Sequence, residues 1–207
     1  MNIPVLLEND DIVLFRKGEK NMSRVDLGSK PLSTPQPVWI LATYDENGNA
    51  DAMNAAWGGI SEINEVSVCL SPEHKTCKNF AKTSALTISM ATEKQMIACD
   101  YVGIVSYNDD KDKMKKSGFT TTKSKFVNAP IINELPICLE CKVKNFDENT
   151  CILKAEIVNV SVDESVMTNG KVDLAKVRPI AFDPFNNKYN VLGEIVGDAF
   201  SSGSKLK

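Results

Sequence analysis

Small and polar side chains alternate along residues 49–61, NADAMNAAWGGIS, in a pattern that suits contact with a flat ligand. In an extended strand, one face carries Ala50, Ala52, Asn54, Ala56 and Gly58, and the other carries Asp51, Met53, Ala55, Trp57 and Gly59. A strand that only fills a core is rich in Val and Ile. Alanine and glycine instead let a broad planar ring approach the backbone, and polar side chains can reach the ring's polar edge. The alternative is close strand-to-helix packing, with a barrel corner at the glycine pair.

A second candidate binding element follows at residues 71–82. Ser71 and Pro72 are typical of a helix N-cap and first turn, so PEHKTCKNFAK (72–82) is predicted to be a short helix. Lys75 and Thr76 would lie near its N-terminus, where free backbone N–H groups and the helix dipole favour a phosphate. With the small-residue strand, this fits a phosphorylated planar cofactor, and an ordinary helix cap is the alternative. His74 is either a neighbour of the phosphate or a residue of the helix surface.

The residue inventory argues against catalysis by side chains alone. The chain has one histidine and no G-x-S-x-G motif, so a Ser-His-Asp hydrolase is not supported. A zinc site with two or three histidines is impossible for the same reason. Neither G-x-G-x-x-G nor a P-loop occurs, which disfavours those nucleotide sites. We therefore expect no catalytic side chain and no metal, and we assign any chemistry to a bound cofactor.

The six cysteines are expected to be reduced thiols, because a chain of 207 residues does not need disulfides to fold. Cys138 and Cys141 have C-x-x-C spacing within PICLECKVK, but this segment alternates like a strand. An offset of three then puts the two sulfurs on opposite faces. A metal or dithiol site is therefore disfavoured there.

The charge balance excludes several classes of partner. With 24 basic and 27 acidic residues, the net charge is -3, so no nucleic acid or anionic lipid surface is expected as a partner.

No apolar run approaches the roughly 18 residues of a membrane helix. The N-terminus, MNIPVLLENDD, meets acidic residues too early for a secretory signal. The predicted location is the cytoplasm, with no membrane partner.

Strands outnumber helices in the predicted order of elements. Residues 38–44 and 49–61 form an antiparallel pair around DENGN, in which Gly48 takes a positive φ. Further strands are expected at 65–71 and 84–90, and the segments 136–146 and 151–162 form a long hairpin. TEKQ (92–95) has the capping-box pattern and is expected to open a helix that ends near Gly103. A second helix is expected over 108–118, with Gly118 as C-cap. Hairpin-linked strands with short helical insertions indicate an antiparallel barrel.

Several longer segments make the pattern more specific. They are PVWILATYDENGNADAMNAAWGGIS (37–61), LSPEHKTCKNFAKTSALTISM (70–90), DYVGIVSYNDDKDKMKKSGFT (100–120), APIINELPICLECKV (129–143) and LAKVRPIAFDPFNNKYNVLGE (174–194). In this order, the chain resembles the flavoredoxin group of the flavin reductase-like proteins, which bind FMN. The resemblance implies a mainly β fold, a split antiparallel β-barrel with short helical insertions, over residues 35–195. We expect residues 1–34 to be an N-terminal arm and residues 196–207 a flexible tail.

The resemblance also implies a set of FMN-binding residues. Asp51, Met53, Asn54, Ala55, Ala56 and Trp57 would line the flavin ring and ribityl chain, and Ser71, Lys75, Thr76, Ser106 and Lys113 would contact the phosphate. One departure concerns Asp51, where the family often has Asn. The implied assembly is a homodimer with FMN at or near the subunit interface.

Three functions remain open from the sequence. The first is an oxidoreductase of the flavin reductase type, which uses NADH or NADPH as substrate and passes electrons to flavin, a metal or a protein acceptor. The second is a flavoredoxin-type electron carrier with tightly bound FMN, no NAD(P)H site and a redox partner protein. The third is a flavin- or haem-binding protein without turnover, because a fold does not fix a function.

Overall fold

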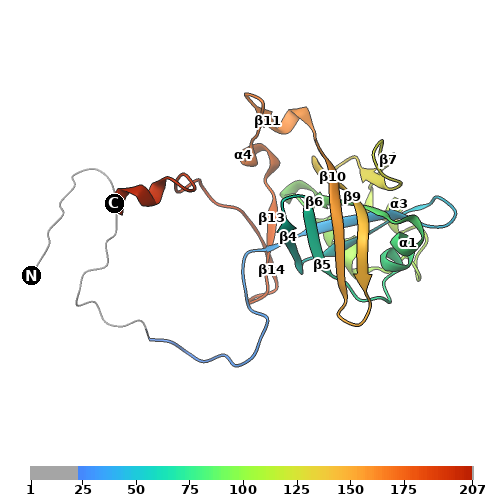
Figure 1. Ribbon diagram of the computed structural model, residues 1–207, viewed down its shortest axis with the longest axis horizontal. Coiled ribbons are helices and arrows are strands. Elements are labelled where there is room, and N and C mark those ends of the chain that lie inside the picture. The colour runs from blue at the N-terminus through green and yellow to red at the C-terminus, as the bar shows by residue number, and fades with distance from the viewer. Residues whose placement is uncertain (1–22, 207) are drawn as a thin grey trace, which may run out of the picture. The chain divides into compact units, whose positions relative to one another are not determined.

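The computed structural model describes residues 23–206 (Figure 1). The chain divides into two units, one ending at Pro31 and one beginning at Leu32. Residues 23–31 are exposed and contain no helix or strand. Residues 1–22 of the expected N-terminal arm and Lys207 of the expected tail lie outside the described residues.

The second unit is built on one seven-stranded antiparallel sheet, in which β9 and β10 are the longest strands (Figure 1). Its strand order is β3-β2-β6-β9-β10-β5-β4. The bounds are β2 (Trp39–Tyr44), β3 (Ala50–Ala55), β4 (Gly58–Glu62), β5 (Glu65–Cys69), β6 (Ala85–Met90), β9 (Ile137–Asp147) and β10 (Ile152–Val162). The prediction of a mainly β fold with hairpin-linked strands is confirmed.

The short link between the two edge strands forces this sheet to curl. β3 and β4 lie at opposite edges, yet only Ala56 and Trp57 separate them in the sequence. Neighbouring strands are about 4.8 Å apart, so the edges of a flat seven-stranded sheet would be roughly 29 Å apart. The chain from Ala55 to Gly58 spans at most about 11 Å. The sheet therefore closes into a barrel that stays split between β3 and β4, because these two strands do not pair.

Smaller elements surround this barrel. Three further sheets comprise β1 (Gln36–Pro37) with β13 (Ile180–Asp183) and β14 (Lys188–Val191), β7 (Thr121–Lys123) with β8 (Pro130–Ile132), and β11 (Met167–Thr168) with β12 (Lys171–Val172). The α-helices are α1 (Lys75–Thr83), α2 (Met96–Ile104), α3 (Lys113–Ser117) and α4 (Leu174–Val177), and the 3₁₀ helices are η1 (Glu93–Gln95), η2 (Glu164–Val166) and η3 (Ser202–Leu206). Within residues 23–206, no helix has the length and apolar character needed to cross a membrane.

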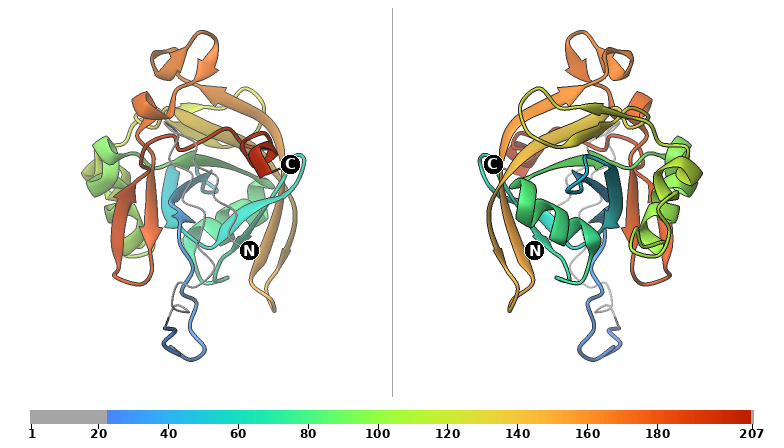
Figure 2. Two further views of the ribbon diagram at one scale, coloured as in Figure 1. Left: turned by 90° about the vertical axis from the view of Figure 1, so that its left-hand side faces the viewer. Right: turned by 90° about the vertical axis from the view of Figure 1, so that its right-hand side faces the viewer.

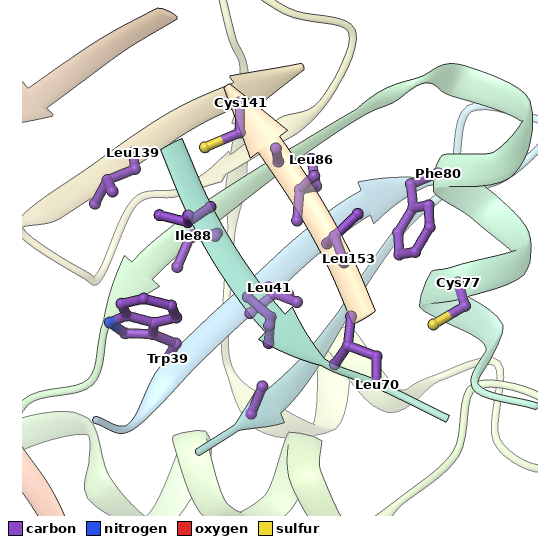
Figure 3. Packing of buried hydrophobic residues seen from close by; sticks show 14 residues of the cluster. Trp39, Leu41, Leu70, Cys77, Phe80, Leu86, Ile88, Leu139, Cys141 and Leu153 are labelled. Carbon is purple, nitrogen blue, oxygen red and sulfur yellow. The ribbon is translucent and has the colours of Figure 1, made fainter. Parts of the chain in front are cut away.

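Two hydrophobic cores share strand β2 between them. Trp39 and Leu41 pack on one face with side chains from β6, β9, β10 and α1, as Figure 3 shows. Ile40 and Ala42, on the other face, pack with Val102 of α2. Burial of both faces explains why β2 is apolar from Trp39 to Ala42. It also fixes α2 against the outside of the barrel, beside β3.

The turns agree with the sequence predictions where a special backbone conformation is needed. Gly48 has a φ of 80°, and the Asp45 carboxylate accepts hydrogen bonds from the backbone N–H groups of Asn47 and Asn49 in the same turn. Gly118 ends α3 with a φ of 77°.

Cys138 and Cys141 lie on β9, and both are buried. Cys141 belongs to the core cluster around Trp39 and Leu41, and Cys138 does not. This places the two side chains on opposite faces, as predicted.

Several predicted boundaries are wrong. The strand expected over residues 49–61 is broken, because β3 ends at Ala55 and a new strand, β4, begins at Gly58. The expected helix over 108–118 is shorter, because α3 begins only at Lys113. The expected capping box at Thr92 is absent, since the side chain of Thr92 caps nothing and its backbone forms a β-bridge with Pro179. A 3₁₀ turn, η1, therefore precedes α2.

The helix after β5 begins three residues later than predicted. His74, not Ser71, is the N-cap residue of α1, and Ser71 is exposed. The Ser71 carbonyl accepts a hydrogen bond from the His74 N–H at 3.1 Å. This tight turn takes the place of the first helical turn, so the prediction that Ser71 caps the helix is wrong.

Candidate functional site

A polar hollow of about 240 Å³ lies where β3, α1, α2 and α3 meet. Its lining is Asp51, Met53, Asn54, His74, Lys75, Thr76, Val102, Gly103, Ile104, Val105, Ser106, Tyr107 and Lys113. The β3 residues are placed by pairing with β2, in the register Thr43 to Asp51 and Ile40 to Asn54. Segments far apart in the sequence thus supply one wall each.

A buried ion pair stands in the polar hollow. Lys113 Nζ lies 3.5 Å from Asp51 Oδ1, and Thr76 Oγ1 donates to Asp51 Oδ2 at 3.1 Å. Asp51 is 1% exposed and Lys113 is 3% exposed. Burial raises the pKa of Asp51, opposed by Lys113 and Thr76, and burial lowers the pKa of Lys113, opposed by Asp51. Both groups are therefore shifted towards their neutral forms, because burial outweighs their mutual attraction.

Hydrogen-bond donors remain free at this hollow. Within the described residues, the backbone N–H groups of Lys75 and Thr76, at the start of α1, have no acceptor. The Lys113 ammonium has three N–H donors, and Asp51 is its one partner among those residues. A helix N-terminus together with an under-partnered buried ammonium is suited to hold an anion.

An aromatic hollow of about 330 Å³ adjoins the polar one. Its lining is Met53, Asn54, Ala55, Ala56, Trp57, Cys69, Leu70, His74, Asp100, Gly103, Ile104, Phe182 and Tyr189. Trp57 and Phe182 meet edge to face, with ring centroids 6.4 Å apart, and Phe182 lies 6.2 Å from Tyr189. Figure 2 shows the β13–β14 hairpin, which carries Phe182 and Tyr189, beside α2 in both views.

A hydrogen bond ties this hairpin to α2. The Tyr189 hydroxyl donates to Asp100 Oδ1 at 2.7 Å, and Asn54 Nδ2 lies 3.5 Å from the same hydroxyl. Burial, together with the Asp100 carboxylate, raises the pKa of Tyr189 to about 12. Tyr189 therefore keeps its proton at neutral pH and holds the aromatic wall against α2.

The two hollows meet where α2 approaches β3 most closely. They share Met53, Asn54, His74, Gly103 and Ile104. A Cβ atom at Gly103 would lie 2.8 Å from Asn54 Cβ, so only glycine permits this approach. The result is one continuous site with an apolar, aromatic end and a cationic end, which is suited to a planar ring that carries an anionic group.

The structure brings together almost all of the residues chosen from the sequence. Asp51, Met53, Asn54, Ala55, Ala56, Trp57, Lys75, Thr76, Ser106 and Lys113 line one hollow or both. Ser71 lines neither, because the late start of α1 leaves it in the preceding turn. Within residues 23–206, no cluster of three or more His, Cys, Asp or Glu side chains could hold a metal ion.

The contributions of the β13–β14 hairpin and of α2 to the site were not predicted from the sequence. Phe182, Tyr189 and Asp100 lie in segments that carried the family resemblance, but they received no role. The available signal was weak, since no strand or hairpin was predicted at residues 174–194 and aromatic side chains are common in cores. Gly103 was interpreted as a helix end, whereas its main constraint is the contact with Asn54.

The two adjoining hollows lie on a split antiparallel β-barrel, and this architecture defines the class of fold to which the chain belongs. The family model for the flavin reductase like domain matches residues 32–178, and the chain belongs to this family. The predicted family and the predicted split-barrel fold are both confirmed.

Three solved structures have the same fold. Flavoredoxin of Desulfovibrio vulgaris (Miyazaki F) is 33% identical, with a TM-score of 0.83 over 87% of this chain and 100% of that chain. Flavoredoxin from Methanosarcina acetivorans is 22% identical, with a TM-score of 0.81 over 90% of this chain and 100% of that chain. An FMN-binding domain of a flavin reductases-like enzyme from Shewanella baltica is 20% identical, with a TM-score of 0.71 over 79% and 89% of the two chains.

Proposed function

We propose that this protein binds FMN and acts as a redox protein. The observation that carries the proposal is the continuous site, whose aromatic end suits the flavin ring and whose cationic end suits the phosphate. Family membership and the similarity to flavoredoxins support the same ligand.

The side chains present fit this cofactor. Ala55 and Ala56 leave the backbone accessible to a ring, and Trp57 borders the aromatic hollow with 44% of its surface exposed. Lys75, Thr76, Ser106 and Lys113 would hold the phosphate, together with the free N–H groups at the start of α1. When bound, FMN supplies hydride and single-electron chemistry, and the chain's own residues bind and orient it.

The proposed activity is that of an NAD(P)H-dependent oxidoreductase of the flavin reductase type, which passes electrons to flavin, a metal ion or a protein. The 33% identity to a flavoredoxin favours a second candidate, an electron carrier with tightly bound FMN and no NAD(P)H site. The two candidates differ in their electron donor.

Anaerobic mixing distinguishes them. The purified protein, loaded with FMN, is mixed with NADH or NADPH, and the visible absorption band of oxidised flavin is followed. Rapid bleaching supports the oxidoreductase. Bleaching by a reduced protein donor alone supports the carrier. Loss of FMN on a desalting column would refute the carrier with tightly bound FMN, and an absence of any FMN binding in a fluorescence titration would refute both candidates.

We also propose that the protein forms a homodimer that covers the split side of the barrel. Edge strand β4 and the turn after it expose Ile60 by 62% and Ile63 by 99%, and Trp57 precedes this strand. Exposed apolar side chains along an open strand edge favour pairing with another surface. A second copy there would lie next to the aromatic hollow, consistent with the interface position that the family resemblance implies.

A further inference from the structure

The ion pair in the polar hollow leaves Lys113 without a short hydrogen bond. Charge-assisted N–H···O bonds are usually about 2.7–2.9 Å long, whereas Lys113 Nζ is 3.5 Å from Asp51 Oδ1. Asp51 makes its shorter bond to Thr76. Lys113 thus has donor capacity for a second acceptor, and it lies in a hollow that opens onto the start of α1.

We propose that Asp51 is a specificity-determining residue that couples phosphate binding to proton uptake. Its carboxylate competes with the ligand's phosphate monoester for Lys113, and it accepts one proton from solvent when that phosphate binds. This inference rests on the proposed function, because FMN is the phosphate monoester in question.

The charges around the hollow support this competition. The groups that line it from each element are Asp51 on β3, His74 and Lys75 at the start of α1, Tyr107 after α2, and Lys113 on α3, while Asp45 and Glu46 in the β2–β3 turn interact with Lys75. A phosphate monoester carries a charge of about -1.5 to -2 near neutral pH. Placed on Lys113, it would lie beside a buried carboxylate of the same sign. Two such anions at close range favour the uptake of one proton by the pair. A free phosphate monoester, with a second pKa of about 6, is a weaker acid than a free aspartate carboxyl group. In the hollow, however, the phosphate would keep Lys113 and the start of α1 as partners, whereas the buried Asp51 would lose Lys113, so we assign the proton to Asp51.

Burial already prepares Asp51 for this step. It raises the pKa of this carboxyl group before any ligand is present, and a phosphate nearby raises that pKa further. Within the pH window between those two pKa values, one proton is taken up per FMN bound. FMN affinity should therefore fall about tenfold for each pH unit in that window. Riboflavin has no phosphate, so its affinity should not follow this dependence.

The isosteric variant Asp51→Asn tests the inference. FMN and riboflavin titrations, followed by flavin fluorescence, are performed from pH 7 to pH 9, where the phosphate stays almost fully ionised. We expect Asp51→Asn to bind FMN about tenfold more tightly than the wild type at the upper end of this range, with a smaller pH slope. Riboflavin affinity should be unchanged. The residual slope of the variant reports Lys113, whose own pKa is lowered by burial.

Glu46→Gln is the matched control, because Glu46 is an exposed carboxylate that also interacts with Lys75. It should keep the wild-type pH slope. Weaker FMN binding by Asp51→Asn, or a slope equal to that of the wild type, would overturn the inference.

Calorimetry of the wild-type protein provides a second test that needs no variant. FMN binding is measured in two buffers that differ in ionisation enthalpy, which reveals the number of protons exchanged. Up to one proton should be taken up with FMN and none with riboflavin. FMN binding without proton uptake anywhere from pH 7 to pH 9, where the phosphate itself hardly titrates, would refute the coupling but leave the proposed function intact. An absence of FMN binding would refute the proposed function itself.

Discussion

Adjacent glycines at the start of β4 should respond in opposite ways to the same substitution. A Cβ atom at Gly58 would lie 2.8 Å from Trp39 Cζ3 and 3.0 Å from the backbone oxygen of Ser67. At Gly59, nothing lies within 4 Å of the added atom. Trp39 is a buried core residue, and Ser67 is fixed by strand pairing, so neither neighbour can move freely. Gly58→Ala should therefore overpack the core, whereas Gly59→Ala should not.

The expected magnitude follows from two opposing effects. Both substitutions reduce the entropy of the unfolded chain, which stabilises the fold by about 0.4–1 kcal/mol. Overpacking at Gly58 costs about 1–3 kcal/mol in addition. Because the entropy gain is common to both variants, the difference in the free energy of unfolding isolates the clash. It should be about 1–3 kcal/mol in favour of Gly59→Ala, which corresponds to a difference of about 2–12 °C in Tm.

Urea denaturation followed by circular dichroism measures this difference, with all proteins at one concentration because self-association would shift the apparent stability. Equal free energies of unfolding for the two variants would show that the close contact of Gly58 with Trp39 and Ser67 does not constrain the fold.

Further predictions concern thiols, the ring end of the site and assembly. Burial raises the pKa of Cys77, Cys99 and Cys141 to about 12, and of Cys138 to about 11. At pH 8 these four thiols stay protonated and inaccessible, so a thiol reagent should label only Cys69 and Cys151 rapidly in the native protein; fast labelling of a third cysteine would contradict this burial. Trp57→Ala should weaken FMN and riboflavin binding alike, and a loss confined to FMN would place Trp57 at the phosphate. Analytical ultracentrifugation should detect a dimer, and a stable monomer that retains FMN would count against the proposed interface.

The sequence could predict much of the fold because the signals were local. The apolar run at residues 38–44, the alternation at residues 136–146 and 151–162, and the Asn-Gly turn at Gly48 each specify a strand or hairpin without reference to distant residues. The curl of the sheet was not visible in the same way. It depends on the pairing order that places β3 and β4 at opposite edges, and the pairing order is a long-range property.

Site residues that lie together in one segment could be predicted from the sequence. Contacts between distant segments could not. The β3 residues and Lys75–Thr76 follow from local pattern and family resemblance. The contact of Lys113 with Asp51 joins residues 62 positions apart, and that of Tyr189 with Asp100 joins residues 89 positions apart. Local residue types do not reveal such pairings. The wrong prediction of Ser71 as helix cap has a different cause. Ser71 and Pro72 are a favourable local signal for a helix start, but the chain forms a turn there and α1 begins only at Lys75.

The phosphate end of the site is the central claim, and paired titrations with FMN and riboflavin test it most directly. These ligands share one ring system and differ in the phosphate. The wild-type protein should bind FMN more tightly than riboflavin. Lys113→Ala should weaken FMN binding by about 1.5–3 kcal/mol, the range for hydrogen bonds to charged groups, and should leave riboflavin binding nearly unchanged. Equal affinity of the wild type for both ligands, or an equal loss of both in Lys113→Ala, would show that the polar hollow does not bind the phosphate.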